Sequence, residues 1–372
     1  MQSFRPPFWL RNPHLQSILA SSPLRKRQLK QQSQHWINRS RSLLLSGGKG
    51  AHLLGYWTPG ENQQAPLAIL LHGWEGTTDS GYLLSCANRL VNEGYQVLRV
   101  ALRDHDQSHH LNRELFHSCR LDEVVNAISN GIKRINAERN HLIGFSLGGN
   151  FAIRISEQLS SGMRSHDDNS FQGNSLQGNS LDNQSLDNQS LDNQSLDEQT
   201  LDDKHPQNNL LDSTIAICPL MIAADTMKKL QLGPAIYHHY FSKKWRRSIR
   251  KKMNLYPQDY TQLDLQRVKS LQDLTDYFVR HHTDFASTEH YFDGYSIYAD
   301  RLNQLSIPVE ILMSLDDPII NPSFLKPLES LPSVRVTYTQ HGGHCGFIKN
   351  RQHQSWADDF VVEKLKATAH SE

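Results

Sequence analysis

A serine set between closely spaced glycines is the feature of this chain that most directly suggests chemistry. Residues 144–149 read Gly-Phe-Ser-Leu-Gly-Gly, after a short apolar run and before a helix-like run. A strand, a Gly-x-Ser-x-Gly turn and a helix hold a serine on a sharp turn as a nucleophile. Side chains at Gly144 or Gly148 would crowd the neighbouring strand and helix, and the helix N-terminus directs N–H groups toward the serine oxygen. Ser146 is therefore the candidate nucleophile for acyl transfer.

The partners that such a serine requires, a base and a carboxylate that orients it, have candidates near the end of the chain. Asp316 and Asp317 follow one strand-like run, and His341 and His344 follow the next. Asp317 is preferred to Asp316 because the Pro-Ile-Ile after it matches an Asp-x-apolar pattern. His344 is preferred to His341 because it lies in Gly-Gly-His-x-Gly, where small neighbours let the imidazole approach the serine. The order Ser, Asp, His is that of a known class of hydrolytic triads.

Two backbone N–H groups are expected to stabilise the oxyanion of the reaction. The first belongs to Leu147, directly after the nucleophile. The second belongs to Trp74, in the loop His72-Gly73-Trp74 that follows an early strand-like run. His72 itself is expected to be structural, hydrogen-bonded to the loop backbone.

Alternating strand-like and helix-like runs must position these groups. Residues 41–58 predict a hairpin that turns at Gly47-Gly48. Strands are expected at 67–71, 95–102, 141–145, 213–219, 307–313 and 334–339, and helices at 80–93, 119–138 and about 352–367. This alternation predicts an α/β protein with a mostly parallel central sheet flanked by helices. The acid and base candidates then lie on loops beyond strand ends, where ligands bind in such sheets.

The chain divides into segments of different composition. A five-residue Ser-Leu-Asp-Asn-Gln unit recurs between 160 and 212, and its period suits neither a helix nor a strand face, so this segment is expected to be a disordered insertion. The expected division is a surface arm at 1–35, a core at 36–159 and 213–221, this low-complexity insertion at 160–212, an aromatic-rich helical lid at 222–300, and the rest of the core at 301–372.

Composition limits the classes of function. The 372 residues carry a net charge of +1, so no overall field favours nucleic acid, and the apolar fraction of 37% is low largely because of the insertion. Four scattered cysteines favour reduced thiols in a cytoplasmic protein over a disulfide framework. The N-terminus lacks the pattern of a signal peptide, and no apolar run is long enough for a membrane span. Residues 103–110 combine Arg, Asp and His, but their spacing is not that of a zinc site, and a solvated loop is expected.

A basic stretch at 243–252 carries seven cations around Trp245 and Ile249, which lie four residues apart on one helical face. The simplest interpretation is a solvated helix face. The functional alternative is a lid that makes weak peripheral contact with an anionic membrane, placing the protein at the inner membrane surface, or that steers acidic substrates.

Several of these motifs together resemble the YheT-like branch of the α/β-hydrolase superfamily. The resemblance rests on His72-Gly73-Trp74-Glu75-Gly76, on the segment 144–150, on Asp316-Asp317-Pro318, on 342–347, and on the N-terminal segment 6–16. It covers nearly the whole chain outside 160–212, and it implies an α/β-hydrolase fold with a Ser-Asp-His esterase site, acting on carboxylic esters that include lipids. The chain departs from this branch at Cys345, where an apolar residue usually follows the histidine.

The residues thus predict a serine esterase in which Ser146 attacks an ester carbonyl, His344 accepts the proton and Asp317 orients the histidine. No metal or organic cofactor is expected, and the partner is a small-molecule ester with an apolar acyl chain. Two alternatives remain open at this point: an acyltransferase or thioesterase with the same triad, and a catalytically silent binding protein that uses the hydrolase pocket. The sequence leaves the oligomeric state open.

Overall fold

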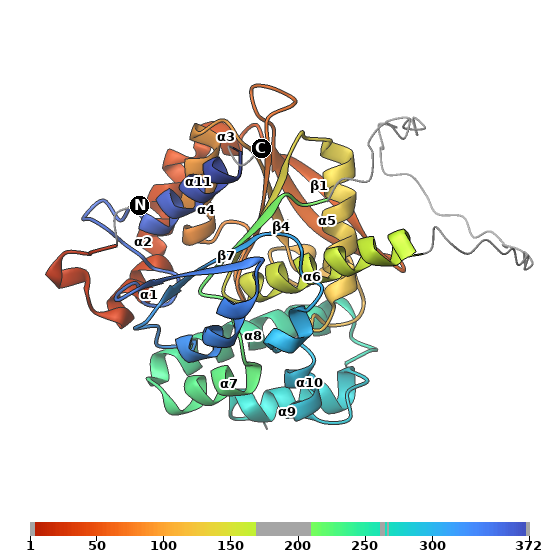
Figure 1. The fold of residues 1–372 in the computed structure, drawn as a ribbon. Helices are drawn as coiled ribbons and strands as arrows, with labels where there is room; N and C mark the ends of the chain where they lie inside the picture. Colours follow the sequence, from red (N-terminus) through yellow and green to blue (C-terminus); the bar gives the residue numbers. More distant parts are fainter. Residues whose placement is uncertain (1–3, 169–209, 261–264, 266–267, 370–372) are drawn as a thin grey trace, which may run out of the picture.

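The protein, seen in a computed structural model, is an α/β fold built on one eight-stranded sheet; the structure describes residues 4–168, 210–260, 265 and 268–369 (Figure 1). The strands are β1 (Arg41–Gly48), β2 (Ala51–Thr58), β3 (Leu67–Leu71), β4 (Gln96–Ala101), β5 (Asn140–Phe145), β6 (Ser213–Ile217), β7 (Val309–Ser314) and β8 (Val334–Thr339). Helices of the N-terminal part and the core are α1 (Pro13–Ala20), α2 (Pro23–Gln32), α3 (Gln34–Ile37), α4 (Gly81–Asn92), α5 (Leu121–Ile135), α6 (Leu147–Asp168) and α11 (Trp356–Ala369).

The strand order is β1-β2-β4-β3-β5-β6-β7-β8. β1 and β2 pair antiparallel, as do β2 and β4, and every later pair is parallel. Strands β3, β5 and β6 are buried along their whole length, as expected for parallel strands covered on both faces. The mostly parallel sheet predicted from the sequence is therefore confirmed.

Helices cover both faces of the sheet. α4 packs with α2 and α11 on one side, and α5 packs with α6 on the other (Figure 1). α5 shows why the sequence forms such a helix: its apolar positions recur at helical spacing, acidic Asp122 and Glu123 occupy the first turn, and Lys133 and Arg134 the last. These charges complement the helix dipole. Asn136 ends the helix in the left-handed conformation.

Three segments differ in detail from the expectations. The hairpin turns at Lys49-Gly50 and not at Gly47-Gly48. Gly47 remains in β1, where a Cβ would lie 2.8 Å from a side-chain carbon of Glu123 on α5. The surface arm expected at 1–35 contains α1 and α2, and it buries Gln16 and Arg25 against the core. The insertion expected at 160–212 begins as a continuation of α6, and residues 169–209 lie outside the described part of the chain.

In its described residues, the segment expected to be a lid contains four α-helices, α7 (Ala223–Leu232), α8 (Ala235–Leu255), α9 (Leu271–His282) and α10 (Thr288–Asp293). They gather at one end of the molecule, between β6 and β7 in the chain (Figure 1). A capping box formed by Ser270 and Asp273 begins α9. None of the described helices combines the length and the apolar character needed to span a bilayer.

Candidate active site

Ser146 lies at the turn between β5 and α6 in a strained conformation, with a φ of 54°. The two glycines around it have no space for a side chain. A Cβ at Gly144 would lie 2.1 Å from the carbonyl oxygen of Gly148, and a Cβ at Gly148 would lie 2.5 Å from the carbonyl oxygen of Leu71. The turn is closed by the N–H of Asn150, which donates to the carbonyl of Ser146 at 3.0 Å. The local sequence therefore builds a sharp elbow that presents the serine at the end of the sheet.

The structure brings together the three residues that the sequence suggested for a triad. His344 Nδ1 lies 2.8 Å from Asp317 Oδ2, and His344 Nε2 lies 2.8 Å from Ser146 Oγ. An ionised carboxylate only accepts hydrogen bonds, so in the neutral imidazole Nδ1–H donates to Asp317, and Nε2 accepts the serine O–H. Burial opposes a charged imidazole, but the Asp317 carboxylate and Cys345 outweigh it and raise the pKa of His344 above its ordinary value.

The second aspartate and the second histidine have other positions. Asp316 Oδ1 accepts the N–H of Gly343 at 2.9 Å and the hydroxyl of Ser314, so it joins the loop after β7 to the loop after β8. His341 Nδ1 lies 3.4 Å from Asp316 Oδ2, and it is His344, not His341, that faces the serine. Asp317 is instead held by the N–H groups of Ile319 and Ile320, which donate to its Oδ1 at 2.8 and 2.9 Å.

The loop after β3 lies directly beside the nucleophile. A Cβ at Gly73 would be 3.1 Å from the Cβ of Ser146, so this backbone passes as close as a glycine allows. The N–H groups of Trp74 and Leu147, the expected oxyanion donors, have no hydrogen-bond partner within the described part of the chain. Leu147 is the first residue of α6, whose N–H has no acceptor within the helix. Two free donors thus flank the serine.

Buried neutral histidines hold this loop. His72 Nδ1 lies 2.8 Å from the carbonyl of Gly73, and its Nε2 accepts the N–H of Leu102 at 3.2 Å. His105 Nε2 accepts the N–H of Glu75 at 3.1 Å. Burial lowers the pKa of His72 to about 4 and that of His105 to about 3, so both rings stay neutral near pH 7. His72 has the structural contacts that were expected of it.

The N-terminal helix α1 supports the loop that carries His344. Ser17 Oγ accepts the N–H of His344 at 2.8 Å. Gln16 is completely buried and forms three hydrogen bonds: its Nε2 donates to the carbonyls of Leu10 and Ile348, and its Oε1 accepts the N–H of Ile348. Sequence reasoning assigned no such role to these residues. For Gln16, the segment 6–16 that carried the resemblance was a signal; for Ser17 there was none.

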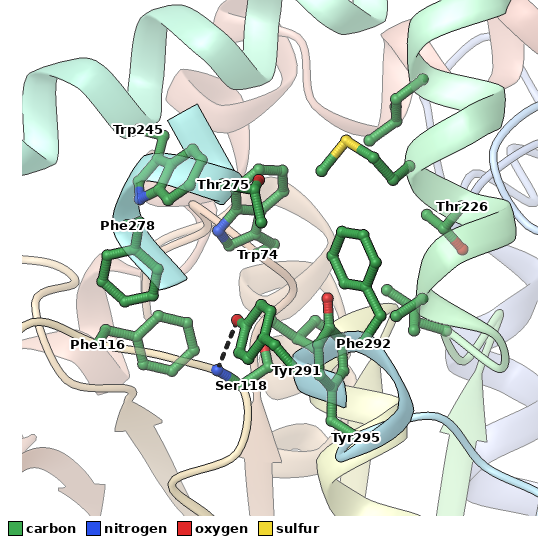
Figure 2. A pocket seen from close by; sticks show the side chains of 15 residues that line it. Trp74, Phe116, Ser118, Thr226, Trp245, Thr275, Phe278, Tyr291, Phe292 and Tyr295 are labelled. Atoms are coloured by element: carbon green, nitrogen blue, oxygen red, sulfur yellow. Dashed lines mark hydrogen bonds between the residues drawn. The ribbon is translucent and has the colours of Figure 1, made fainter. Parts of the chain in front are cut away.

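Three neighbouring cavities lie at or beside the candidate triad. The catalytic pocket, about 140 Å³, is bordered by Ser146, His344, Tyr82 and Trp74. An inner chamber of about 60 Å³ lies beyond Trp74 and Leu147, and Figure 2 shows that its wall is mostly aromatic, with Phe116, Trp245, Phe278, Tyr291, Phe292 and Tyr295. An outer groove of about 380 Å³ runs from His344 between α1 and α8, and Ile18, Pro23, Ile236, Tyr237, Tyr240 and Ile319 line it.

Trp74 separates the catalytic pocket from the inner chamber, since it lines both. Its ring stacks on Phe241 of α8, with centroids 5.2 Å apart and planes inclined by 9°, and meets the edge of Trp245 at 5.4 Å. Asn150 joins the core to the lid, because its Nδ2 donates to the carbonyls of Leu220 and Tyr295. The lid therefore contacts the core in two places: Phe241 and Trp245 pack on Trp74, and the carbonyl of Tyr295 accepts a hydrogen bond from Asn150.

The loop 103–110 was expected to be solvated, and that expectation is wrong. Asp104 is buried and pairs with the buried Lys252 of α8 at 2.5 Å, and the buried Arg103 pairs with Glu123. Ser248 of α8 adds a hydrogen bond to the carbonyl of Asp104 at 3.1 Å. These four charges can be buried because each has an oppositely charged partner. The loop thus anchors the lid to the core.

The basic stretch 243–252 lies on α8 and is used partly inside the protein. Lys244 donates to the carbonyl of Glu75 at 2.8 Å, and Arg246 to the carbonyls of Leu265 and Val268. The two apolar members of the stretch are buried or half-buried among other apolar side chains. Four cations of the stretch remain exposed: Lys243, Arg247, Arg250 and Lys251. Weak contact with an anionic membrane stays a prediction, now based on these four charges, because Trp245 and Ile249 are not exposed.

Comparison with known proteins agrees with this architecture. Residues 66–166 match the family model described as the alpha/beta hydrolase fold. Over 364 residues the chain is 22% identical to "Putative esterase YheT" from Escherichia coli strain K12, covering 95% of this chain and 90% of that protein. It is 21% identical over 369 residues to an abhydrolase domain-containing protein of Dictyostelium discoideum, covering 98% and 80%.

Among solved structures, the chain superposes on the esterase Est1E from Butyrivibrio proteoclasticus, solved with ferulic acid bound. The TM-score is 0.51 at 12% identity, over 88% of this chain and 99% of that one. At this identity the likeness is one of fold. With its eight-stranded, mostly parallel sheet and its serine elbow between β5 and α6, this protein has the α/β-hydrolase fold, and along almost its whole length it is similar to YheT.

Proposed function

We propose that this protein is a serine hydrolase that cleaves carboxylic esters through an acyl-enzyme on Ser146. The observation that carries the proposal is the continuous relay from Asp317 through His344 to Ser146, with both hydrogen bonds at 2.8 Å and the serine on a strained elbow. A serine activated by an oriented imidazole is the arrangement of acyl-transfer enzymes on several unrelated folds.

In the proposed reaction, Ser146 Oγ attacks the ester carbonyl while His344 Nε2 accepts its proton. Asp317 holds the proton on Nδ1 and stabilises the imidazolium that forms. The imidazolium then gives its proton to the leaving alcohol, and water activated by the same nitrogen hydrolyses the acyl-enzyme. The free N–H groups of Trp74 and Leu147 would bind the oxyanion, and each such donor contributes about 3 kcal/mol to transition-state stabilisation in a well-studied protease.

The arrangement of the cavities suggests which part of the ester lies where. Leu147, a proposed oxyanion donor, lines the inner chamber, whereas His344, which must reach the leaving alcohol, lines the outer groove. We therefore place the acyl group in the aromatic chamber and the alcohol in the groove. Because the chamber measures about 60 Å³ and the groove about 380 Å³, a short acyl group on a larger apolar alcohol fits best.

A fluorophosphonate probe and mass spectrometry test the proposal. An adduct on Ser146 that is absent from the His344→Ala protein would support an activated nucleophile. The same preparation should hydrolyse p-nitrophenyl esters, and the Ser146→Ala protein, with an unchanged melting temperature, should not. A thioester panel and added alcohol acceptors distinguish hydrolysis of esters from thioester cleavage or acyl transfer. Absence of both adduct and turnover would contradict the proposal and favour a binding protein.

A further inference from the structure

Two cysteines lie beside the candidate base, although they are far apart in the sequence. Cys218 directly follows β6, and Cys345 directly follows His344. One ligand atom from each residue, the two sulfurs and a ring nitrogen, all lie within 4.8 Å of one another. Elsewhere in the described ranges, no three His, Cys, Asp or Glu side chains come together in this way. Both thiols are free.

These donors are of the kind that bind thiophilic cations. Two thiolates and one imidazole, with the fourth position open, make up a known type of tetrahedral Zn²⁺ site. With Zn–S bonds of about 2.3 Å, tetrahedral geometry places the sulfurs about 3.8 Å apart. The present separations need to shrink by about 1 Å at most to reach such a geometry.

The surroundings of His344 also suit a metal ligand. Histidines that bind metals usually donate their second ring N–H to a carboxylate, which orients the ring. His344 has this arrangement, since Nδ1 faces Asp317 at 2.8 Å and Nε2 faces the catalytic pocket beside Ser146. Because Asp317 holds the proton on Nδ1, Nε2 is the nitrogen whose lone pair is available to a cation.

The sulfurs are buried but reachable, and their present contacts are weak. Cys218 is 0% and Cys345 5% exposed, yet both Cys345 and His344 border the catalytic pocket, which gives an ion a route inward. The Cys218 thiol donates to the carbonyl of Gly343 at 3.8 Å, and the Cys345 thiol to that of Ile217 at 3.6 Å. Thiols are weak hydrogen-bond donors, so metal binding breaks only weak hydrogen bonds.

We propose that Cys218, Cys345 and His344 form an inhibitory site for a thiophilic divalent cation such as Zn²⁺, with its open position toward the catalytic pocket. Each coordinating thiol releases its proton to solvent, and Nε2 exchanges its hydrogen bond with Ser146 for the metal bond. The serine then has no base. The metal site stands on the donor geometry alone, and only its inhibitory effect rests on the proposed esterase function.

The probe is cadmium. It binds thiolates as zinc does, and it gives a thiolate-to-metal charge-transfer band in the ultraviolet. Titration of the reduced protein in metal-free buffer should produce this band with one Cd²⁺ per chain. Cys218→Ala and Cys345→Ala should each weaken binding by more than about tenfold. Cys119→Ala removes a half-buried cysteine outside the cluster and should bind like wild type. Equal affinity in wild type and the Cys218→Ala protein would overturn the proposal.

Two further measurements separate this site from the proposed esterase function. The Ser146→Ala protein should keep the cadmium band, because serine is not one of the three donors. Zn²⁺ should inhibit ester hydrolysis by the wild type, with recovery on adding a chelator, and each cysteine variant should require more than tenfold higher Zn²⁺ relative to its own rate. Where an alanine variant has a lowered melting temperature, the serine variant at the same position, Cys218→Ser or Cys345→Ser, replaces it. A band without inhibition of an active enzyme, or no band at all, would refute the inhibitory site.

Discussion

Replacing Asp317 with asparagine tests the relay with little change in shape. Asp317 Oδ1 accepts two backbone N–H groups, from Ile319 and Ile320, while Oδ2 faces His344 Nδ1. In the substituted side chain the amide carbonyl oxygen must stay on the two N–H groups, so the NH2 group turns toward Nδ1. The imidazole must then accept a hydrogen bond at Nδ1 and carry its proton on Nε2, where it cannot take the proton of Ser146.

The expected loss of activity follows from this tautomer, in which the proton is on Nε2. The equivalent change in a serine protease lowers kcat by about 10,000-fold, which corresponds to about 5.4 kcal/mol at 1.36 kcal/mol per factor of ten. Because the two backbone hydrogen bonds are retained, the melting temperature of Asp317→Asn should stay close to that of wild type. The assay is kcat/KM for a short-chain p-nitrophenyl ester, measured together with thermal unfolding.

Asp316→Asn is the matched control, since it removes the same charge one residue earlier. Its oxygen can still accept the N–H of Gly343, so we expect activity within about tenfold of wild type. The reasoning is refuted if Asp317→Asn retains activity within tenfold of wild type, or if the two variants lose activity equally.

Three further predictions concern the acyl chamber, the N-terminal helix and a buried histidine. Trp245→Ala enlarges the inner chamber and should shift the preference toward longer acyl esters, whereas Ile236→Ala in the outer groove should not; an unchanged chain-length profile in both would contradict the assignment. Gln16→Ala leaves three buried backbone groups without hydrogen-bond partners, so it should lower the free energy of unfolding, measured in guanidinium, by about 3 kcal/mol. A decrease of less than about 1 kcal/mol would contradict the role of Gln16. Burial lowers the pKa of His141 to about 4, below the unfolded value near 6.5, so folding loses stability as pH falls through this window. Between about pH 7.5 and 5.5, His141→Gln should therefore lose about 1.3 kcal/mol less than wild type, and equal losses would show that this histidine is protonated in the folded state.

Part of the site follows from short stretches of sequence. The serine elbow is local at Gly144, where a side chain would meet the backbone of Gly148 and Gly149, whereas Gly148 is required by the backbone of Leu71 and His72 at the end of the neighbouring strand β3. The positions of Asp317 and His344 beyond strand ends follow from the alternation of strands and helices. Parallel strands bring their carboxyl ends to one edge of the sheet, so loops that follow β7 and β8 must lie close together.

Other features depend on contacts that no local pattern encodes. Lys252 of the basic stretch is buried because the fold places Asp104 opposite it, so a charge that looks solvated in the sequence becomes an anchor of the lid. In the same way, the arm at the N-terminus supports His344 through Ser17 only because α1 packs against the loop after β8.

Short-range patterns in the chain are enough to specify the α/β architecture, the nucleophile elbow and the residue types of the triad, since periodicity and the sterics of Gly144 act over short distances. Only the packed structure reveals that Trp74 divides the pocket from the aromatic chamber and that Cys218 lies beside Cys345. These contacts join side chains that are far apart in the sequence. They depend on strand register and packing, which arise only in the complete fold.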